Sequence, residues 1–172
     1  MADPTWTPAH DIALLYMAAA YGTDHELSPE EGVSVQAALA PWAAGYNLEV
    51  RPTLIEGVTR LTEADSPDEA VDQSIERLSN ELSADHHSDI LEGLVDIAEA
   101  DGVLLQREQG LIAHVATAWG HKALGESLLD NTTAQVEHTN GNWSLIHELA
   151  FLFIAIAHAT HRRNACVHRE RF

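Results

Sequence analysis

Four carboxylates, Asp24, Glu26, Glu30 and Glu31, fall within the stretch YGTDHELSPEEG at positions 21–32. Carboxylate oxygens at this spacing can supply several hard ligands to one divalent cation, which favours Ca²⁺ or Mg²⁺ and also admits Zn²⁺ or Mn²⁺. Asp24 directly follows an apolar run, where the negative end of a helix dipole disfavours it unless a cation or donor compensates. The stretch is not an EF-hand, because Glu31 follows Asp24 too closely in sequence.

The same stretch has a purely structural interpretation. Ser28 can cap a helix, Pro29 can open it, and Glu30 and Glu31 can complement the positive end of its dipole. This interpretation explains SPEE without a metal, but it does not explain Asp24. A metal site and a structural acidic turn both remain open from the residues alone.

A second pair with possible metal chemistry is His10 and Asp11. A His-Asp pair is a ligand signature in some metal-dependent phosphohydrolases, so an enzyme using these residues is a hypothesis to keep. About 21 Å of helix separates His10 from Asp24, so the two cannot share a metal within one hairpin. His10 and Asp11 can lie beside an acidic turn only if neighbouring hairpins pack antiparallel. Alternatively, they are first-turn residues in which the acid favours the helix dipole.

These residues must be positioned by helices, because sequence signals for helix starts recur along the chain and signals for strands are nearly absent. SPEE at 28–31, SPDE at 66–69 and TPAHD at 7–11 each combine a small polar cap with a proline and an acid. The stretch DNTTAQVEHTNGNW at 130–143 is predicted to be a loop. The chain is therefore predicted to be all-α, with helices at 8–22, 29–44, 51–64, 67–83, 86–100, 106–120 and 144–162 and a shorter one near 122–130.

The chain also contains weak internal similarity. At one offset, four positions are identical between two segments, which predicts repeated helical hairpins near 8–44 and 86–120 in a bundle of seven to eight helices. A partial third copy is predicted at 143–161, because the sequence after Trp143 matches the sequence after Trp6. The identities at the common offset are Asp24 with Asp101, Leu27 with Leu104, Glu31 with Glu108, and Trp42 with Trp119.

Two of these segments, AYGTDHELSPEE and AEADGVLLQRE, resemble the hairpin of the tellurite-resistance TerB family, and HDIALLYMAAAYGTD resembles its first helix. The resemblance covers roughly residues 6–125. It implies an all-helical bundle with pseudo-twofold organisation, acidic patches proposed to bind divalent metal, and a role in tellurite resistance and related stress responses. It implies no catalytic activity, and it implies partner proteins that include membrane-embedded members of the same system.

Carried over by position, the resemblance places the acidic turn on Asp24, Glu26 and Glu31 in the first copy and on Asp101 and Glu108 in the second. The second copy departs from the pattern, because Val103 stands where the first has Glu26 and Arg107 where it has Glu30. A full second site is therefore in doubt. With His10 and Asp11, the predicted metal-ligating set is Asp24, Glu26, Glu31, Asp101, Glu108, His10 and Asp11.

The charge balance excludes one class of partner. The 27 acidic residues outnumber nine basic ones, which gives a formal net charge of −18. Four of the arginines lie in the tail 162–172, which we separate from a single helical domain at 1–161. Such acidity repels phosphate backbones and argues against nucleic-acid binding, and it is typical of proteins adapted to concentrated salt.

Location follows from what the sequence lacks. No secretory signal is found at the start, and the longest apolar runs are too short to span a bilayer. We therefore expect a cytoplasmic protein, held at the inner face of the membrane, if at all, through a partner; a homodimer is also allowed. The leading hypothesis is a non-enzymatic metal-binding module that acts through protein interactions, and the main alternative is a metal-free acidic scaffold.

Overall fold

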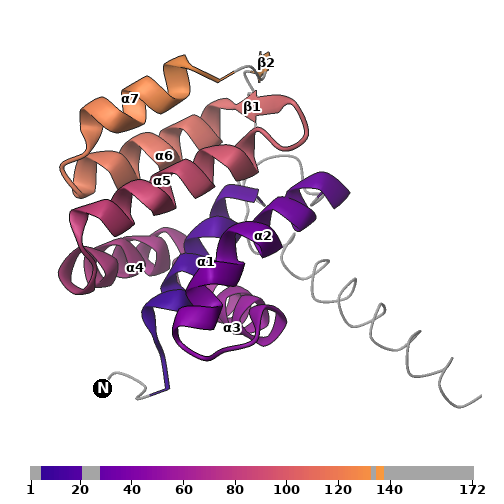
Figure 1. Cartoon of the computed structure of the whole chain (residues 1–172), viewed down its shortest axis with the longest axis vertical. Helices are drawn as coiled ribbons and strands as arrows, with labels where there is room; N and C mark the ends of the chain where they lie inside the picture. Colours follow the sequence, from indigo (N-terminus) through magenta and orange to yellow (C-terminus); the bar gives the residue numbers. More distant parts are fainter. Residues whose placement is uncertain (1–4, 21–27, 133–134, 138–172) are drawn as a thin grey trace, which may run out of the picture.

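The computed structural model describes residues 5–20, 28–132 and 135–137, in which seven helices pack into a bundle (Figure 1). Two short strands join the bundle near its last helix. The elements are α1 (Pro8–Ala20), α2 (Pro29–Gly45), α3 (Val50–Glu63), α4 (Pro67–Glu81), α5 (Ala84–Ala98), β1 (Val103–Leu105), α6 (Gln106–Ala118), α7 (Lys122–Asp130) and β2 (Gln135–Glu137).

Serine caps start three of the helices. The hydroxyl oxygens of Ser28, Ser66 and Ser83 each accept a hydrogen bond from the backbone N–H three residues later, at 3.0, 3.3 and 3.4 Å. These bonds satisfy donors that the first turn of a helix otherwise leaves unpaired. The predicted starts at Pro29 and Pro67 are therefore confirmed, whereas α5 begins at Ala84, two residues before its predicted start.

Helix α1 forms the middle of the core. Every residue from Ala9 to Ala20 is buried, and the helix contacts α2, α3, α4, α5 and α6 (Figure 1). Two glycines allow its neighbours to come close. A Cβ on Gly57 of α3 would lie 3.0 Å from the Leu14 backbone nitrogen, and one on Gly93 of α5 would collide with the Tyr16 phenol. This central position agrees with the apolar character of α1 on nearly every side.

The strands are the part of the described fold that the sequence analysis missed. Strands β1 and β2 pair in parallel, with Val103 opposite Gln135 and Leu105 opposite Glu137. Strand β2 lies inside the stretch 130–143 that was predicted to be a loop. Segments of three residues are too short to show an alternating pattern, so no sequence signal marked them.

Three predictions fall outside the described residues: the helix at 144–162, the partial third copy and the tail 162–172. The all-α prediction is confirmed, but the pseudo-twofold repeat of hairpins stays a prediction. Within the part of the chain that the structure describes, no helix is both long and apolar enough to cross a bilayer.

Candidate functional site

The first acidic turn is described only in part, because Asp24 and Glu26 lie outside the described residues. Glu31 is buried at the third position of α2. Its carboxylate oxygen Oε2 accepts the Ser28 backbone N–H at 2.7 Å, and the Ser28 hydroxyl accepts the Glu31 N–H at 3.0 Å. This reciprocal pair is a capping box, so the structural interpretation of SPEE is confirmed.

The second turn repeats half of this arrangement. Glu108 is buried at the third position of α6, and its Oε2 accepts the Leu105 backbone N–H at 2.8 Å. Leucine has no side-chain acceptor, so the other half of the box cannot form. Before the turn, Oδ1 of the exposed Asp101 accepts the Val103 N–H at 2.8 Å. Glu31 and Glu108, identical at the common offset, therefore cap their helices in the same way.

The starts of α2 and α6 lie at the same end of the bundle. The Ser34 hydroxyl in α2 donates to the Asp96 carbonyl near the end of α5 at 3.3 Å. Ala18, near the end of α1, lines the same cavity as Arg107 and Glu108 of α6. We call this region the acidic end and define it by Glu31, Asp96, Asp101, Arg107 and Glu108 (Figure 1).

Asp11 lies away from the acidic end, in the first turn of α1, and is engaged by other side chains. Its carboxylate is buried and accepts both Nε, at 3.0 Å, and Nη2 of Arg77. The Ser74 hydroxyl and the Trp6 indole N–H each donate to it at 2.9 Å. Asp11 in turn raises the pKa of the Arg77 guanidinium through these hydrogen bonds. The positive charge that balances this carboxylate is therefore an arginine.

His10 is also tied into the start of α1. Its Nδ1 lies 2.9 Å from the Thr7 hydroxyl, and its Nε2 lies 2.8 Å from Oε2 of Glu56 on α3. The length of α1, about 20 Å, separates His10 and Asp11 from the acidic end. The structure thus groups Glu31, Asp101 and Glu108 at one end and His10 with Asp11 at the other. In the described ranges, no three His, Cys, Asp or Glu side chains are placed to hold one metal ion.

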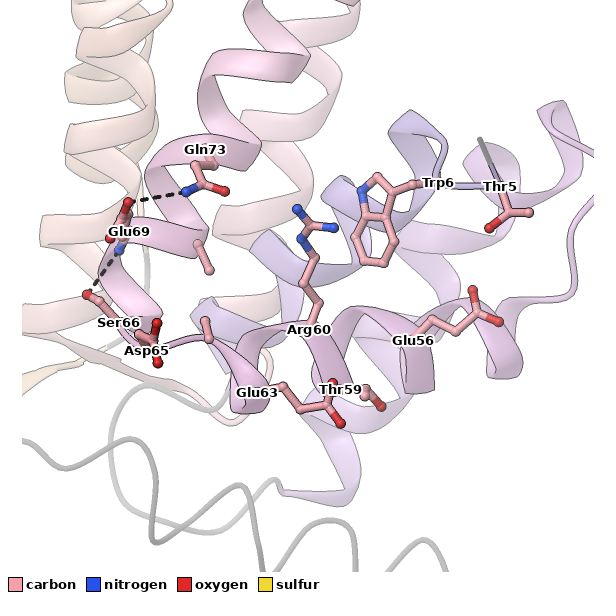
Figure 2. A pocket seen from close by; sticks show the side chains of 12 residues that line it. Thr5, Trp6, Glu56, Thr59, Arg60, Glu63, Asp65, Ser66, Glu69 and Gln73 are labelled. Carbon is pink, nitrogen blue, oxygen red and sulfur yellow. Dashed lines mark hydrogen bonds between the residues drawn. The ribbon is translucent and has the colours of Figure 1, made fainter. Parts of the chain in front are cut away.

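A groove that the sequence analysis did not single out opens beside His10, between the start of α1 and helices α3 and α4. Its volume is about 720 Å³. Figure 2 shows Arg60 extending from α3 toward the Trp6 ring, and its guanidinium carbon lies 4.5 Å from the ring centroid. Trp6 is in turn 4.9 Å from the His10 ring. The aromatic side of the groove is therefore formed by Trp6 with Arg60 over its ring, and His10, which does not line the groove, packs against Trp6.

Carboxylates surround this stack of Trp6 and Arg60. Glu56 and Glu63 come from α3, Asp65 from the turn that follows it, and Glu69 from α4 (Figure 2). We call this region the acidic groove. Four acids against one arginine give it negative charge, which attracts basic groups. The sequence did contain a signal, since Glu56, Arg60 and Glu63 have the spacing of one helix face, but the approach of α4 and Trp6 could not be seen in it.

Buried, paired charges, capped acidic turns and a central apolar helix together define a small, acidic, all-helical bundle. The family model described as tellurite resistance protein TerB matches residues 10–123, and the chain therefore belongs to the TerB family. The match includes both acidic turns and the acidic groove except for Thr5 and Trp6. No curated protein and no solved structure matches the chain. The resemblance stated from the sequence is thus confirmed.

Proposed function

We propose that this chain is a non-enzymatic docking module of a tellurite-resistance system, and that its acidic groove binds a basic segment of a partner protein. The observation that carries the proposal is the pairing of four carboxylates with an aromatic stack around one groove. Lysine and arginine side chains complement such a surface, and arginine also stacks on flat π systems.

Membrane-embedded proteins of the same system are suitable partners. Their cytoplasmic loops carry an excess of lysine and arginine, whatever their individual sequences. An acidic module would meet such loops with favourable long-range attraction, which speeds association at low ionic strength. The proposal therefore predicts binding that weakens steeply with added salt.

A titration of the labelled full chain with a peptide rich in Lys and Arg, followed by NMR, tests this proposal. The double variant Glu63→Gln and Glu69→Gln should bind the peptide about fivefold more weakly. The effect is modest because exposed ion pairs contribute little to the free energy of binding. The control is Asp89→Asn with Glu92→Gln, which removes equal charge from exposed positions on α5. Equal weakening in both variants would show unspecific attraction to an acidic protein and would refute the groove as the docking site.

The second candidate function is divalent-cation binding at the first acidic turn, where Asp24 and Glu26 would supply ligands beside Glu31. Support comes from the composition of the acidic end, which is defined by four acids, Glu31, Asp96, Asp101 and Glu108, and by one basic residue, Arg107. Their oxygens are the hard ligands that Ca²⁺ and Mg²⁺ prefer. His10 and Asp11 do not fit this role, because Glu56 and Arg77 hold them a helix length away.

Calorimetric titration of the full chain with Ca²⁺, Mg²⁺, Mn²⁺ and Zn²⁺ tests the second candidate. Binding tighter than millimolar that is lost in Asp24→Ala, and retained in Asp101→Ala, is the expected result. Unchanged binding in Asp24→Ala, or no binding at all, would leave the metal-free scaffold. A phosphohydrolase site built on His10 and Asp11 has no support in the geometry, since Arg77 occupies the Asp11 carboxylate on which such a site would depend.

A further inference from the structure

Helix α2 is apolar on two opposite faces, and only one of them is covered. Val35, Leu39 and Ala43 are buried in the core. The opposite face carries Val33, Ala37, Ala40 and Ala44, all exposed and spaced as one stripe along the helix. A helix that is apolar on all sides is normally buried, as α1 is here.

The exposed large apolar side chains of the described residues belong to this helix and its cap. Val33 is 68% exposed, and Tyr46, which follows the last residue of α2, is 39% exposed. Elsewhere in the described ranges, side chains of this kind are at least partly covered. Val33 and the three exposed alanines therefore form one apolar stripe, which is a candidate interaction surface, whereas Tyr46 lies 13 positions after Val33 and by helical spacing is not part of it.

We propose that residues 144–161 of the same chain dock on this face of α2. This segment is predicted to be a helix and contains nine consecutive apolar residues at 149–157, so it needs an apolar partner. An 18-residue helix is about 27 Å long and α2, with 17 residues, about 25 Å, so the two match in length. The proposal does not depend on the acidic groove or on metal binding.

The path of the chain makes this contact reachable. The described chain ends at β2, which pairs with β1, and β1 follows α5 after a short turn. Near its end α5 contacts the start of α2, through the hydrogen bond from Ser34 to Asp96. Residues 138–143 can span about 20 Å when extended, so the apolar segment is not confined to the immediate surroundings of β2.

Hydrogen exchange on the full chain tests the contact. In the wild type, the amides of residues 149–157 should exchange at least tenfold more slowly than in an unfolded peptide. The double variant Ala37→Glu and Ala40→Glu places two charges on the exposed face of α2. It should remove the protection of residues 149–157, while the amides of α5 and α6 stay protected. Ala113→Glu with Ala123→Glu, at exposed alanines of α6 and α7, is the control and should leave the protection unchanged.

Two results would overturn the proposal: unprotected amides at 149–157 in the wild type, or equal protection in both double variants. Cross-linking then identifies the occupant. In a Cys166→Ser background, Ala40→Cys is combined in turn with Ala150→Cys, Ala155→Cys or Ala157→Cys, in a mixture of light and heavy isotope-labelled chains. Cross-links within one chain support the proposal. Cross-links between chains, or none in any pair, contradict it.

Discussion

At the scale of single residues, the structure shows that Asp11, a candidate metal ligand, is part of a buried ion pair. Asp11 has the type and neighbour of a metal ligand, yet it lies 66 positions before Arg77, which holds it with two hydrogen bonds. No local pattern reveals a partner at that distance in the chain. In contrast, the capping function of Glu31 was predictable, because its partner Ser28 is three residues away.

Replacing Asp11→Asn should destabilise the protein by about 3 kcal/mol, because it removes the charge from a buried pair and leaves Arg77 without its counterion. The free energy of unfolding in urea measures this loss. The matched control is Asp72→Asn, which breaks an exposed pair with His114 at 2.7 Å. That change should cost less than about 1 kcal/mol. Equal losses in the two variants would contradict the structural role of Asp11.

The burial of Tyr16 should make the free energy of unfolding decrease at high pH. Burial raises the pKa of its phenol, an effect that a side-chain hydrogen bond with Trp42 partly offsets. Because the unfolded chain releases this proton near pH 10 while the folded chain retains it, the free energy of unfolding should decrease as pH rises above about 10. Urea melts between pH 8 and 11 should show a smaller decrease in Tyr16→Phe than in Tyr46→Phe, whose phenol is more exposed.

At the scale of helices and strands, the sequence predicted most of the described elements. Serine caps, prolines at first positions and apolar runs marked the helices, because these signals are local and each has its own physical cause. The strands β1 and β2 depend on pairing between positions 103–105 and 135–137. Local sequence cannot reveal such a pairing in segments so short, so only the structure could.

Close packing between α3 and α1 gives an element-scale prediction. In Gly57→Ala the new methyl would lie 3.0 Å from the Leu14 backbone nitrogen and 3.2 Å from Ala13 Cβ. The helices must separate, so we expect a net loss of about 1–2 kcal/mol in urea unfolding. Gly110→Ala, in α6, meets no atom within 4 Å. It should instead stabilise by up to about 1 kcal/mol, through helix propensity and reduced chain entropy.

At the scale of the whole molecule, charge sets the response to salt. With a formal net charge of −18, the folded chain repels itself, and this repulsion weakens as the screening length shortens. The melting temperature should therefore rise by several degrees between about 0.05 and 2 M NaCl. A variant with Glu63→Gln, Glu69→Gln, Asp89→Asn and Glu92→Gln should show a smaller rise. A melting temperature independent of salt would argue against adaptation to concentrated salt.

The candidate sites were predictable from sequence to different degrees. The acidic turns were found because their acids are close in the chain, and Glu31, Asp101 and Glu108 do lie at one end of the bundle. The acidic groove was not found, since it combines Trp6, helix α3 and Glu69 of α4. Trp6 is 50 positions before Glu56 in the sequence, and it meets α3 and α4 because both helices pack against α1.

The central place of α1 also bears on how the protein is made. A ribosome delivers α1 before the helices that surround it, and α5 and α6 emerge much later. Until then its apolar side chains have little of the bundle to cover them, which makes the growing chain prone to capture by chaperones that hold unfolded segments. Chains stalled after α3 should therefore be retained by such chaperones, and chains stalled after α7 should be released.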